Sequence, residues 1–152
     1  MTELTALIVD DVPANREFLE RLLAGAKFKV TAAGSGTAAL QSVDHLETLP
    51  LAVVDMKLPD MSGLELVTKL RQKYPDAYVV VASMYDERSR MEQAFAAGCN
   101  VYLVKPHGFM DLFKRLMQDK PDNLRKAPPI IIDQYGPRPF KPSTRPLTPT
   151  PS

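Results

Sequence analysis

Polar residues stand at the ends of four short apolar segments, and their types suit chemistry on an anion. These residues are Asp10 and Asp11, Asp55, Ser83 and Lys105. Carboxylates held close together raise each other's pKa unless a cation intervenes, and a hard divalent ion such as Mg²⁺ takes oxygen ligands of this kind. A lysine then supplies positive charge for a bound anion. The set is typical of phosphoryl transfer, in which a carboxylate can itself form an aspartyl phosphate.

These residues meet only if the apolar segments are neighbouring strands of one sheet. The segments are short, rich in β-branched residues and apolar on both faces, which is typical of buried parallel strands. We predict strands at Leu4–Val9, Phe28–Thr31, Leu51–Val54, Tyr78–Ala82 and Val101–Val104. In an open parallel sheet, ligands bind beyond the carboxyl ends of the strands, near the point where the strand order reverses. The acids, the hydroxyl and the lysine should therefore converge there.

Helical periodicity follows each predicted strand. Pro13 suits a first helical turn, and Gly25 and Gly98 stand where helices should end. Ser62 and Glu65 have the spacing of a capping box. Five strand–helix units joined by right-handed crossovers predict an α/β fold, a doubly wound five-stranded parallel sheet with helices on both faces.

Composition excludes several classes of protein. The 152 residues include 19 basic and 18 acidic side chains, a net charge of +1, so direct nucleic-acid binding is not expected. The chain has one cysteine, so it forms no internal disulfide and no Cys-rich zinc module. We find no apolar stretch long enough to cross a bilayer and no signal peptide, and we expect a cytoplasmic protein without membrane insertion.

The motifs taken together resemble the receiver domain of two-component response regulators, of the single-domain, chemotaxis-regulator-like type with a flavodoxin-like fold. The matching residues stand in the family's order and spacing over about residues 4–120. They are Val9-Asp10-Asp11, the run from Asp55 to Gly63, Ser83, and Tyr102-Leu103-Val104-Lys105-Pro106.

The resemblance implies a role for each matched position. Asp55 is the expected phosphoacceptor. Asp10, Asp11, Asp55 and the backbone carbonyl of Lys57 are the expected Mg²⁺ ligands, with Asp10 acting largely through water.

Further roles follow from the same resemblance. Ser83 and Lys105 are expected to contact the phosphoryl oxygens. Tyr102 is the expected aromatic switch, whose ring turns inward when Ser83 moves toward the phosphate. The peptide bond before Pro106 is expected to be cis.

Two positions should set the lifetime of the phosphoryl group. Lys57 and Tyr85 lie two residues after Asp55 and Ser83, where receivers tune the access of water. A long side chain and an aromatic ring obstruct water there, so we expect a long-lived phosphoryl state.

The last part of the chain differs in composition. Residues 121–152 hold nine of the 14 prolines, and we expect a receiver domain at 1–120 followed by a Pro-rich tail without an independent fold. Three interpretations of the tail stay open: a linker, a segment that docks on its own domain or on a second copy, or a peptide motif. Pro129–Asp133 is the apolar part that would add as a strand, and Arg138–Pro142 has a PxxP core.

We therefore expect a signalling switch and not a turnover enzyme. A histidine kinase or phosphotransfer protein would donate the phosphoryl group. The output would be a downstream protein or a homodimer. The homodimer would form through the tail or through the face that receivers usually use, made by the fourth helix, the fifth strand (Val101–Val104) and the fifth helix. The alternative is a receiver-fold adaptor that acts without phosphorylation.

Overall fold

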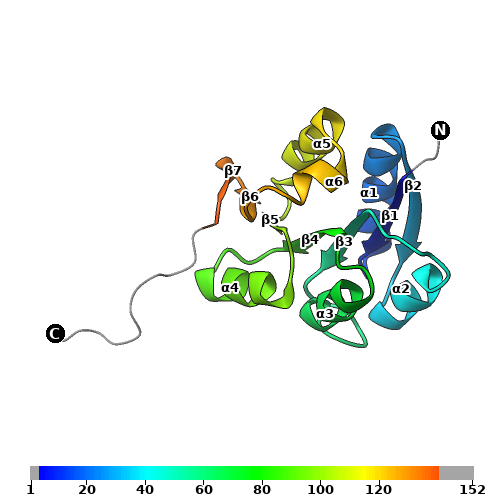
Figure 1. The fold of residues 1–152 in the computed structure, drawn as a ribbon. Coiled ribbons are helices and arrows are strands. Elements are labelled where there is room, and N and C mark those ends of the chain that lie inside the picture. The colour runs from blue at the N-terminus through cyan, green and yellow to red at the C-terminus, as the bar shows by residue number, and fades with distance from the viewer. Residues whose placement is uncertain (1–3, 141–152) are drawn as a thin grey trace.

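The computed structural model describes residues 4–140 as one sheet between two layers of helices (Figure 1). The strands are β1 (Leu4–Val9), β2 (Phe28–Ala33), β3 (Leu51–Asp55), β4 (Tyr78–Ser83), β5 (Val101–Val104), β6 (Ile130–Asp133) and β7 (Gly136–Pro139). The helices are α1 (Pro13–Gly25), α2 (Gly36–Val43), α3 (Gly63–Lys73), α4 (Arg88–Ala97), α5 (Phe109–Gln118) and α6 (Pro121–Leu124).

The strand order is β2-β1-β3-β4-β5-β6-β7, and all neighbours are parallel except β6 and β7. From β1 the chain first moves outward to β2 and then returns to place β3 on the other side of β1. The order therefore reverses between β1 and β3, so a crevice is expected beyond their carboxyl ends.

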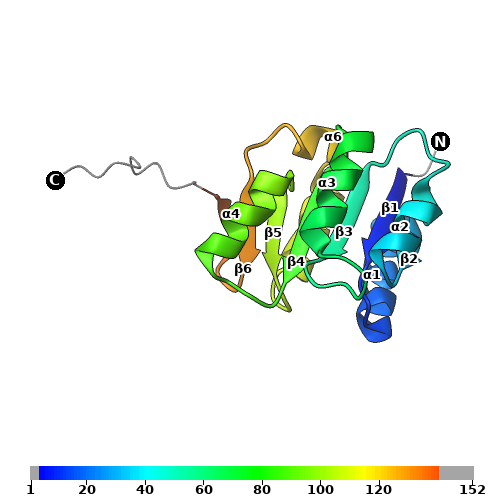
Figure 2. The same ribbon diagram turned by 90° about the horizontal axis from the view of Figure 1, so that it is seen from below.

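Each face of the sheet has its own apolar core. Helices α2, α3 and α4 cover one face, seen in front of the sheet in Figure 2, and α1, α5 and α6 cover the other. Strands β1, β3, β4 and β5 alternate side chains between the two cores, and most of their residues are fully buried. This burial on both faces explains why these strands are continuous apolar runs in the sequence.

The predicted helix ends are confirmed where a cap was expected. Pro13 begins α1, and Gly98 ends α4 with a positive φ of 115°. The Ser62 hydroxyl accepts a hydrogen bond from the Glu65 N–H at 3.0 Å. No helix within residues 4–140 has the length and apolar character needed to span a membrane.

The flavodoxin-like α/β fold is confirmed, but the prediction of five strands is wrong. Residues 130–133 add a sixth strand beside β5, and residues 136–139 add a seventh that turns back antiparallel. Residues 130–133 and 136–139 thus belong to the same sheet as the preceding strands, and Leu124 of α6 packs in its core. This agrees with the interpretation that the tail docks on its own domain. Proline density suggested an extended tail because proline cannot donate to an inner ladder, but an edge strand tolerates it. Residues 141–152 lie outside the described residues.

Candidate functional site

The predicted acids and lysine come together at the carboxyl ends of β1, β3 and β5. One carboxylate oxygen from each of Asp10, Asp11 and Asp55 lies within 4.8 Å of the others. The Lys105 ammonium group is 2.8 Å from Asp55 Oδ1 and 3.3 Å from Asp10 Oδ2. The strand order explains why these side chains meet. Strands β1 and β3 are neighbours at the reversal point, and Lys105 extends toward them from the end of β5, two strands away from β3.

Asp10 is the most deeply placed of the three acids, with a side chain only 2% exposed. Its carboxylate accepts hydrogen bonds from the Val12 N–H at 2.9 Å and from the Asn15 amide at 3.3 Å. The Arg16 guanidinium binds the Asp10 backbone carbonyl at 2.7 Å. The first turn of α1 therefore holds the end of β1 in place.

Asn15 and Arg16 were missed by the sequence analysis. A polar pair one helical turn beyond the Asp10–Asp11 pair was the signal that could have identified them.

Burial opposes the charge on Asp55. Its pKa is raised above the usual value because desolvation and the charges of Asp10 and Asp11 outweigh the hydrogen bond from Lys105. Burial lowers the pKa of the Lys105 ammonium group. The hydrogen bonds and negative charges of Asp55 and Asp10 raise it by more, so the pKa of Lys105 is above its ordinary value. Three acids facing one lysine leave an excess of negative charge, which a cation would neutralise.

A close backbone approach at Gly63 shapes the loop after Asp55. A Cβ at this position would lie 2.1 Å from the Asp55 carbonyl oxygen and 2.8 Å from the Met56 Cα. The Gly63 N–H donates to the Met56 carbonyl at 2.7 Å, so the start of α3 rests directly on the strand that carries Asp55. Glycine is required here for lack of space.

Asp60, in the same loop, has a structural role. Its carboxylate accepts the N–H groups of Gly36 and Thr37 at 2.9 Å each, at the start of α2. Hydrogen bonds from Thr37 and Gly36 lower the pKa of Asp60 to about 2. Asp60 therefore tethers the loop to α2 and is separate from the acid cluster.

Ser83, Tyr85 and Tyr102 form a hydrogen-bonded group beside the acids. The Tyr102 hydroxyl donates to the Tyr85 carbonyl at 2.8 Å, and the Tyr85 N–H donates to Ser83 Oγ at 3.1 Å. Burial raises the pKa of Tyr102, although the neighbouring Ser83 hydroxyl works in the opposite direction. The Tyr102 ring is fully buried and points inward.

The cavity at this edge contains most of the residues predicted to act. It has a volume of about 550 Å³, and its lining includes Asp11, Asp55, Lys57, Ser83, Tyr85, Lys105 and Pro106. Asp10 lies behind the lining. Tyr102 lies in the core beneath it, and the Lys105–Pro106 peptide bond is cis, as the resemblance implied.

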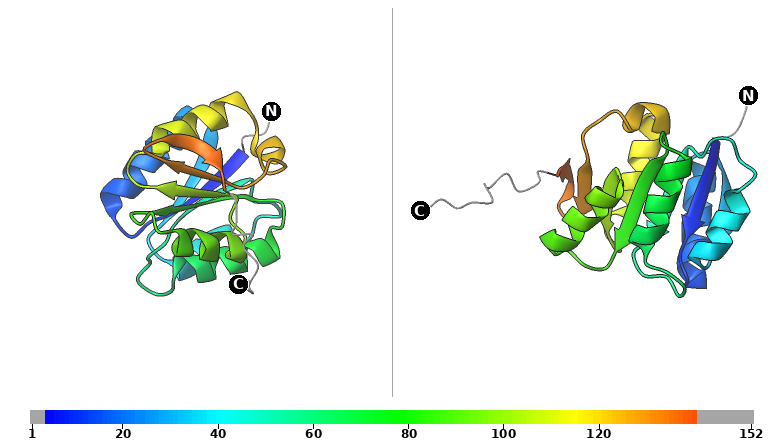
Figure 3. Two further views of the ribbon diagram at one scale, coloured as in Figure 1. Left: turned by 90° about the vertical axis from the view of Figure 1, so that its left-hand side faces the viewer. Right: turned by 60° about the horizontal axis from the view of Figure 1, so that its bottom comes forward.

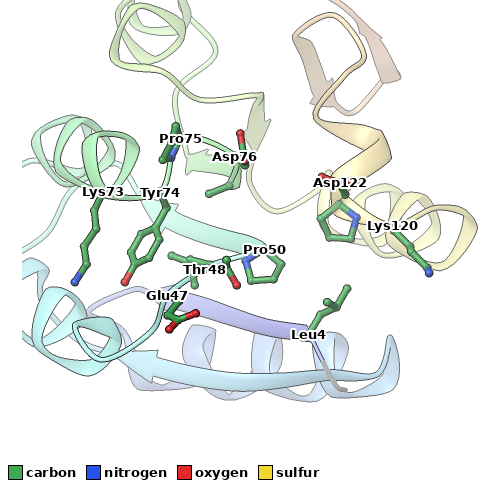
Figure 4. A pocket seen from close by; sticks show the side chains of 13 residues that line it. Leu4, Glu47, Thr48, Pro50, Lys73, Tyr74, Pro75, Asp76, Lys120 and Asp122 are labelled. Atoms are coloured by element: carbon green, nitrogen blue, oxygen red, sulfur yellow. The ribbon is translucent and has the colours of Figure 1, made fainter. Parts of the chain in front are cut away.

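A second cavity lies at the opposite, amino ends of the strands (Figure 4). Two of its polar side chains have partners: Lys73 binds Asp44 at 3.0 Å, and the Tyr74 hydroxyl donates to the Val43 carbonyl at 2.7 Å. Among its described lining residues, no group of three acids lies close enough together to hold a metal ion. The chemistry is therefore concentrated at the carboxyl edge.

Comparison with known proteins identifies the family. Residues 6–117 match the response regulator receiver domain, and the chain belongs to this family. Among curated relatives, it is 35% identical over 103 residues to a cyclic di-GMP phosphodiesterase of Thermotoga maritima. The matched region is 68% of this chain and only 27% of that relative, so the chain spans about a quarter of its length.

Solved structures agree with this assignment. A CheY-like receiver domain from Methanospirillum hungatei superposes with a TM-score of 0.73 at 28% identity, covering 82% of this chain and 98% of that one. A response regulator from Burkholderia pseudomallei gives a TM-score of 0.68 at 28% identity, covering 75% of this chain and 66% of that one. The latter was crystallised with a phosphorylated aspartic acid, a calcium ion and citrate.

The donor set here fits a hard divalent cation. Carboxylate oxygens are the ligands that Mg²⁺ and Ca²⁺ prefer, and three of them lie within 4.8 Å of one another. Asp11 is exposed and Asp55 is partly exposed, so an ion can reach them from solvent. The acid cluster can therefore bind a metal ion.

Proposed function

We propose that this chain is a phosphorylation switch that accepts a phosphoryl group on Asp55 from the phosphohistidine of a kinase or phosphotransfer protein. The observation that carries the proposal is the cluster of Asp10, Asp11 and Asp55 together with Lys105 at 2.8 Å from Asp55. This combination provides negative charge for a metal ion and positive charge for the incoming phosphoryl oxygens.

The reaction is a transfer between two nucleophiles. An Asp55 carboxylate oxygen attacks phosphorus, the P–N bond of the donor breaks, and its electron pair returns to the donor imidazole. Bound Mg²⁺, held by Asp11, Asp55 and the Lys57 carbonyl with Asp10 through water, would neutralise charge on the transferring group.

The neighbouring side chains then serve the acyl phosphate. Lys105 moves its hydrogen bond from the Asp55 carboxylate to a phosphoryl oxygen, and the Ser83 hydroxyl donates to another. Both groups already line the same cavity as Asp55. The protein acts on its own carboxylate only, so we infer no turnover of a separate substrate.

We further propose that Lys57 and Tyr85 slow hydrolysis of the acyl phosphate. Both line the cavity, and the Arg90 guanidinium carbon lies 4.0 Å from the centre of the Tyr85 ring and restrains it. Lys57→Ala and Tyr85→Ala should each lose the phosphoryl group several-fold faster, as measured by the decay of the adduct. Unchanged decay in both variants would contradict this role.

Asp55→Asn is the direct test of the phosphoacceptor, and Asp60→Asn is a matched control. Each protein is incubated with acetyl phosphate with and without Mg²⁺, and the adduct is followed by intact mass. Wild type and Asp60→Asn should form a Mg²⁺-dependent phosphate adduct, whereas Asp55→Asn should form none. If wild type forms no adduct under any condition, the function is that of a phosphorylation-independent adaptor.

A further inference from the structure

Three groups donate hydrogen bonds to the Asp10 carboxylate. The Val12 N–H donates to Oδ1 at 2.9 Å. The Asn15 amide nitrogen lies 3.3 Å from Oδ2 and 3.5 Å from Oδ1. The Lys105 ammonium group donates to Oδ2 at 3.3 Å. Within residues 4–140, Asn15 and Lys105 are therefore the two donors to Oδ2.

Lys105 is shared between two carboxylates, and the other one is closer. Its ammonium group is 2.8 Å from Asp55 Oδ1. In the proposed reaction Lys105 turns toward a phosphoryl oxygen on Asp55, and this movement draws it away from Asp10. The Asp10 side chain is only 2% exposed, so bulk water cannot readily replace a lost donor. A buried carboxylate that loses a charged donor is destabilised unless another donor remains.

The Asn15 side chain is placed to be that remaining donor. Asn15 is the third residue of α1, and Figure 3 (right) shows β1, in dark blue, leading into the blue helix α1. The Asn15 N–H donates to the Val12 carbonyl at 3.0 Å. The Arg16 guanidinium group binds the Asp10 carbonyl at 2.7 Å. The backbone is therefore held on both sides of the contact between Asn15 and Asp10.

Asn15 also faces the site itself. Its side chain is half-buried and lines the same cavity as Asp11, Asp55 and Lys105. An amide donates hydrogen bonds without carrying charge. Asn15 can therefore orient Asp10 and leave its negative charge available to a cation, whereas a second lysine at this position would compete with the cation.

We propose that Asn15 is a positioning residue for phosphoryl transfer, which holds the Asp10 carboxylate in place when Lys105 leaves it for the phosphoryl group. Asn15 acts through Asp10 and takes no part in bond making. The movement of Lys105 rests on the proposed function; the hold on Asp10 as a partner of the bound cation does not. Hydrogen-bond partners that orient metal ligands typically contribute about 10–100-fold in metal affinity or activity.

The loss of Asn15 should weaken the phosphorylated state most. Without a phosphoryl group, Lys105 still donates to Asp10 Oδ2 and supports the carboxylate. With a phosphoryl group on Asp55, Asn15 is the donor that remains. Removal of the Asn15 amide should therefore affect Mg²⁺ binding little and affect binding of a phosphoryl mimic strongly. A purely structural residue would instead lower the stability of the fold and would not single out the second step.

Asn15→Leu and Asn123→Leu form a matched pair for the test. Leucine has nearly the shape of asparagine but carries no donor. Asn123 also donates its amide to a carboxylate, Asp119 Oδ1 at 2.9 Å, but it belongs to α6 and does not line the site cavity. Asn15→Gln keeps an amide at the position and tests for rescue.

The full-length proteins are compared in three measurements. Titration calorimetry gives the Mg²⁺ affinity, and then the affinity for beryllofluoride, a phosphoryl mimic, at saturating Mg²⁺. Thermal unfolding gives the stability of each variant. Asn15→Leu should bind Mg²⁺ about threefold more weakly than wild type and beryllofluoride at least about tenfold more weakly. Asn15→Gln should recover part of the beryllofluoride affinity, and Asn123→Leu should match wild type in both affinities.

Beryllofluoride affinity equal to that of wild type in Asn15→Leu would overturn the proposal. A loss no larger for beryllofluoride than for Mg²⁺ would overturn it as well, as would a loss that Asn15→Gln does not relieve. A wild type that binds Mg²⁺ but accepts neither beryllofluoride nor phosphate would instead defeat the proposed function together with the movement of Lys105. The Mg²⁺ affinity of Asn15→Leu would then still decide whether Asn15 holds Asp10 for the cation, and an unchanged affinity would reject that role.

Discussion

The receiver core and the segment that follows it use different means to occupy one sheet. Strands β1, β3, β4 and β5 are apolar on both faces and lie between two helical layers. Segment 121–140 has one strand of three isoleucines, and its second strand contains two prolines. The core strands are held by packing on both sides, whereas β7 is tolerated because it lies at an edge. A proline-rich composition therefore does not separate a tail from a domain.

The largest expected effect tests whether β6 is part of the cooperative core. Ile132 is fully buried, and Ile132→Ala should lower the free energy of unfolding by about 3 kcal/mol through lost burial and cavity formation. Leu112→Ala, at an equally buried position in α5, is the control. Urea unfolding should show one transition for both variants. A separate early transition in Ile132→Ala alone would mean that the segment formed by β6 and β7 unfolds on its own.

The next effect concerns the loop that carries the acid cluster. Gly63→Ala should cost about 1–3 kcal/mol, because the new methyl group forces α3 away from the Asp55 carbonyl. The displaced loop should also weaken Mg²⁺ binding, measured by titration calorimetry. Gly25→Ala, where a Cβ meets only the Phe113 ring at 3.7 Å, should leave Mg²⁺ affinity unchanged. Wild-type affinity in Gly63→Ala would show that the close approach is not needed for the site.

A smaller effect is expected at the outer edge of the sheet. The double variant Pro137→Thr with Pro139→Thr restores two outward N–H groups to β7. It should self-associate weakly with increasing concentration, whereas Arg138→Thr, whose N–H already faces β6, should not do so by this route. Sedimentation analysis distinguishes them. A strictly monomeric double variant would show that the prolines do not protect this edge.

The smallest effects are in the pH dependence of stability, where Asp55 and Asp60 act in opposite directions. The pKa of Asp60 is lowered from 3.8 to about 2, so its contribution is complete above its ordinary pKa and is lost as the pH falls toward about 2. The pKa of Asp55 is raised, mainly by burial, so its ionisation costs stability as the pH rises through that raised value.

Thermal unfolding from about pH 2 to neutrality measures both slopes. Asp60→Asn should reduce the loss of stability in acid, and Asp55→Asn should reduce the loss on the neutral side. Identical profiles for the two variants would contradict this assignment.

Much of the core and its site was determined by the sequence. Apolar runs without alternation predicted strands buried on both faces, and the predicted bounds of β1 and β5 agree with the structure. Because parallel strands end at a common edge, Asp10, Asp55 and Lys105 could be placed together before any distance was known. Local signals such as the Ser62 cap act within a few residues and are readable for that reason.

Only the tertiary structure decided the features that depend on contacts between distant residues. The sequence could not show whether Ile130–Asp133 would pair with β5 of its own domain or with a neighbour, because both uses satisfy the same backbone groups. Nor could it show that the Tyr102 hydroxyl bonds the Tyr85 carbonyl, or that Phe140 stacks on Phe95. Composition shows that a segment has apolar side chains to bury, but the arrangement of the whole sheet decides against which surface they are buried.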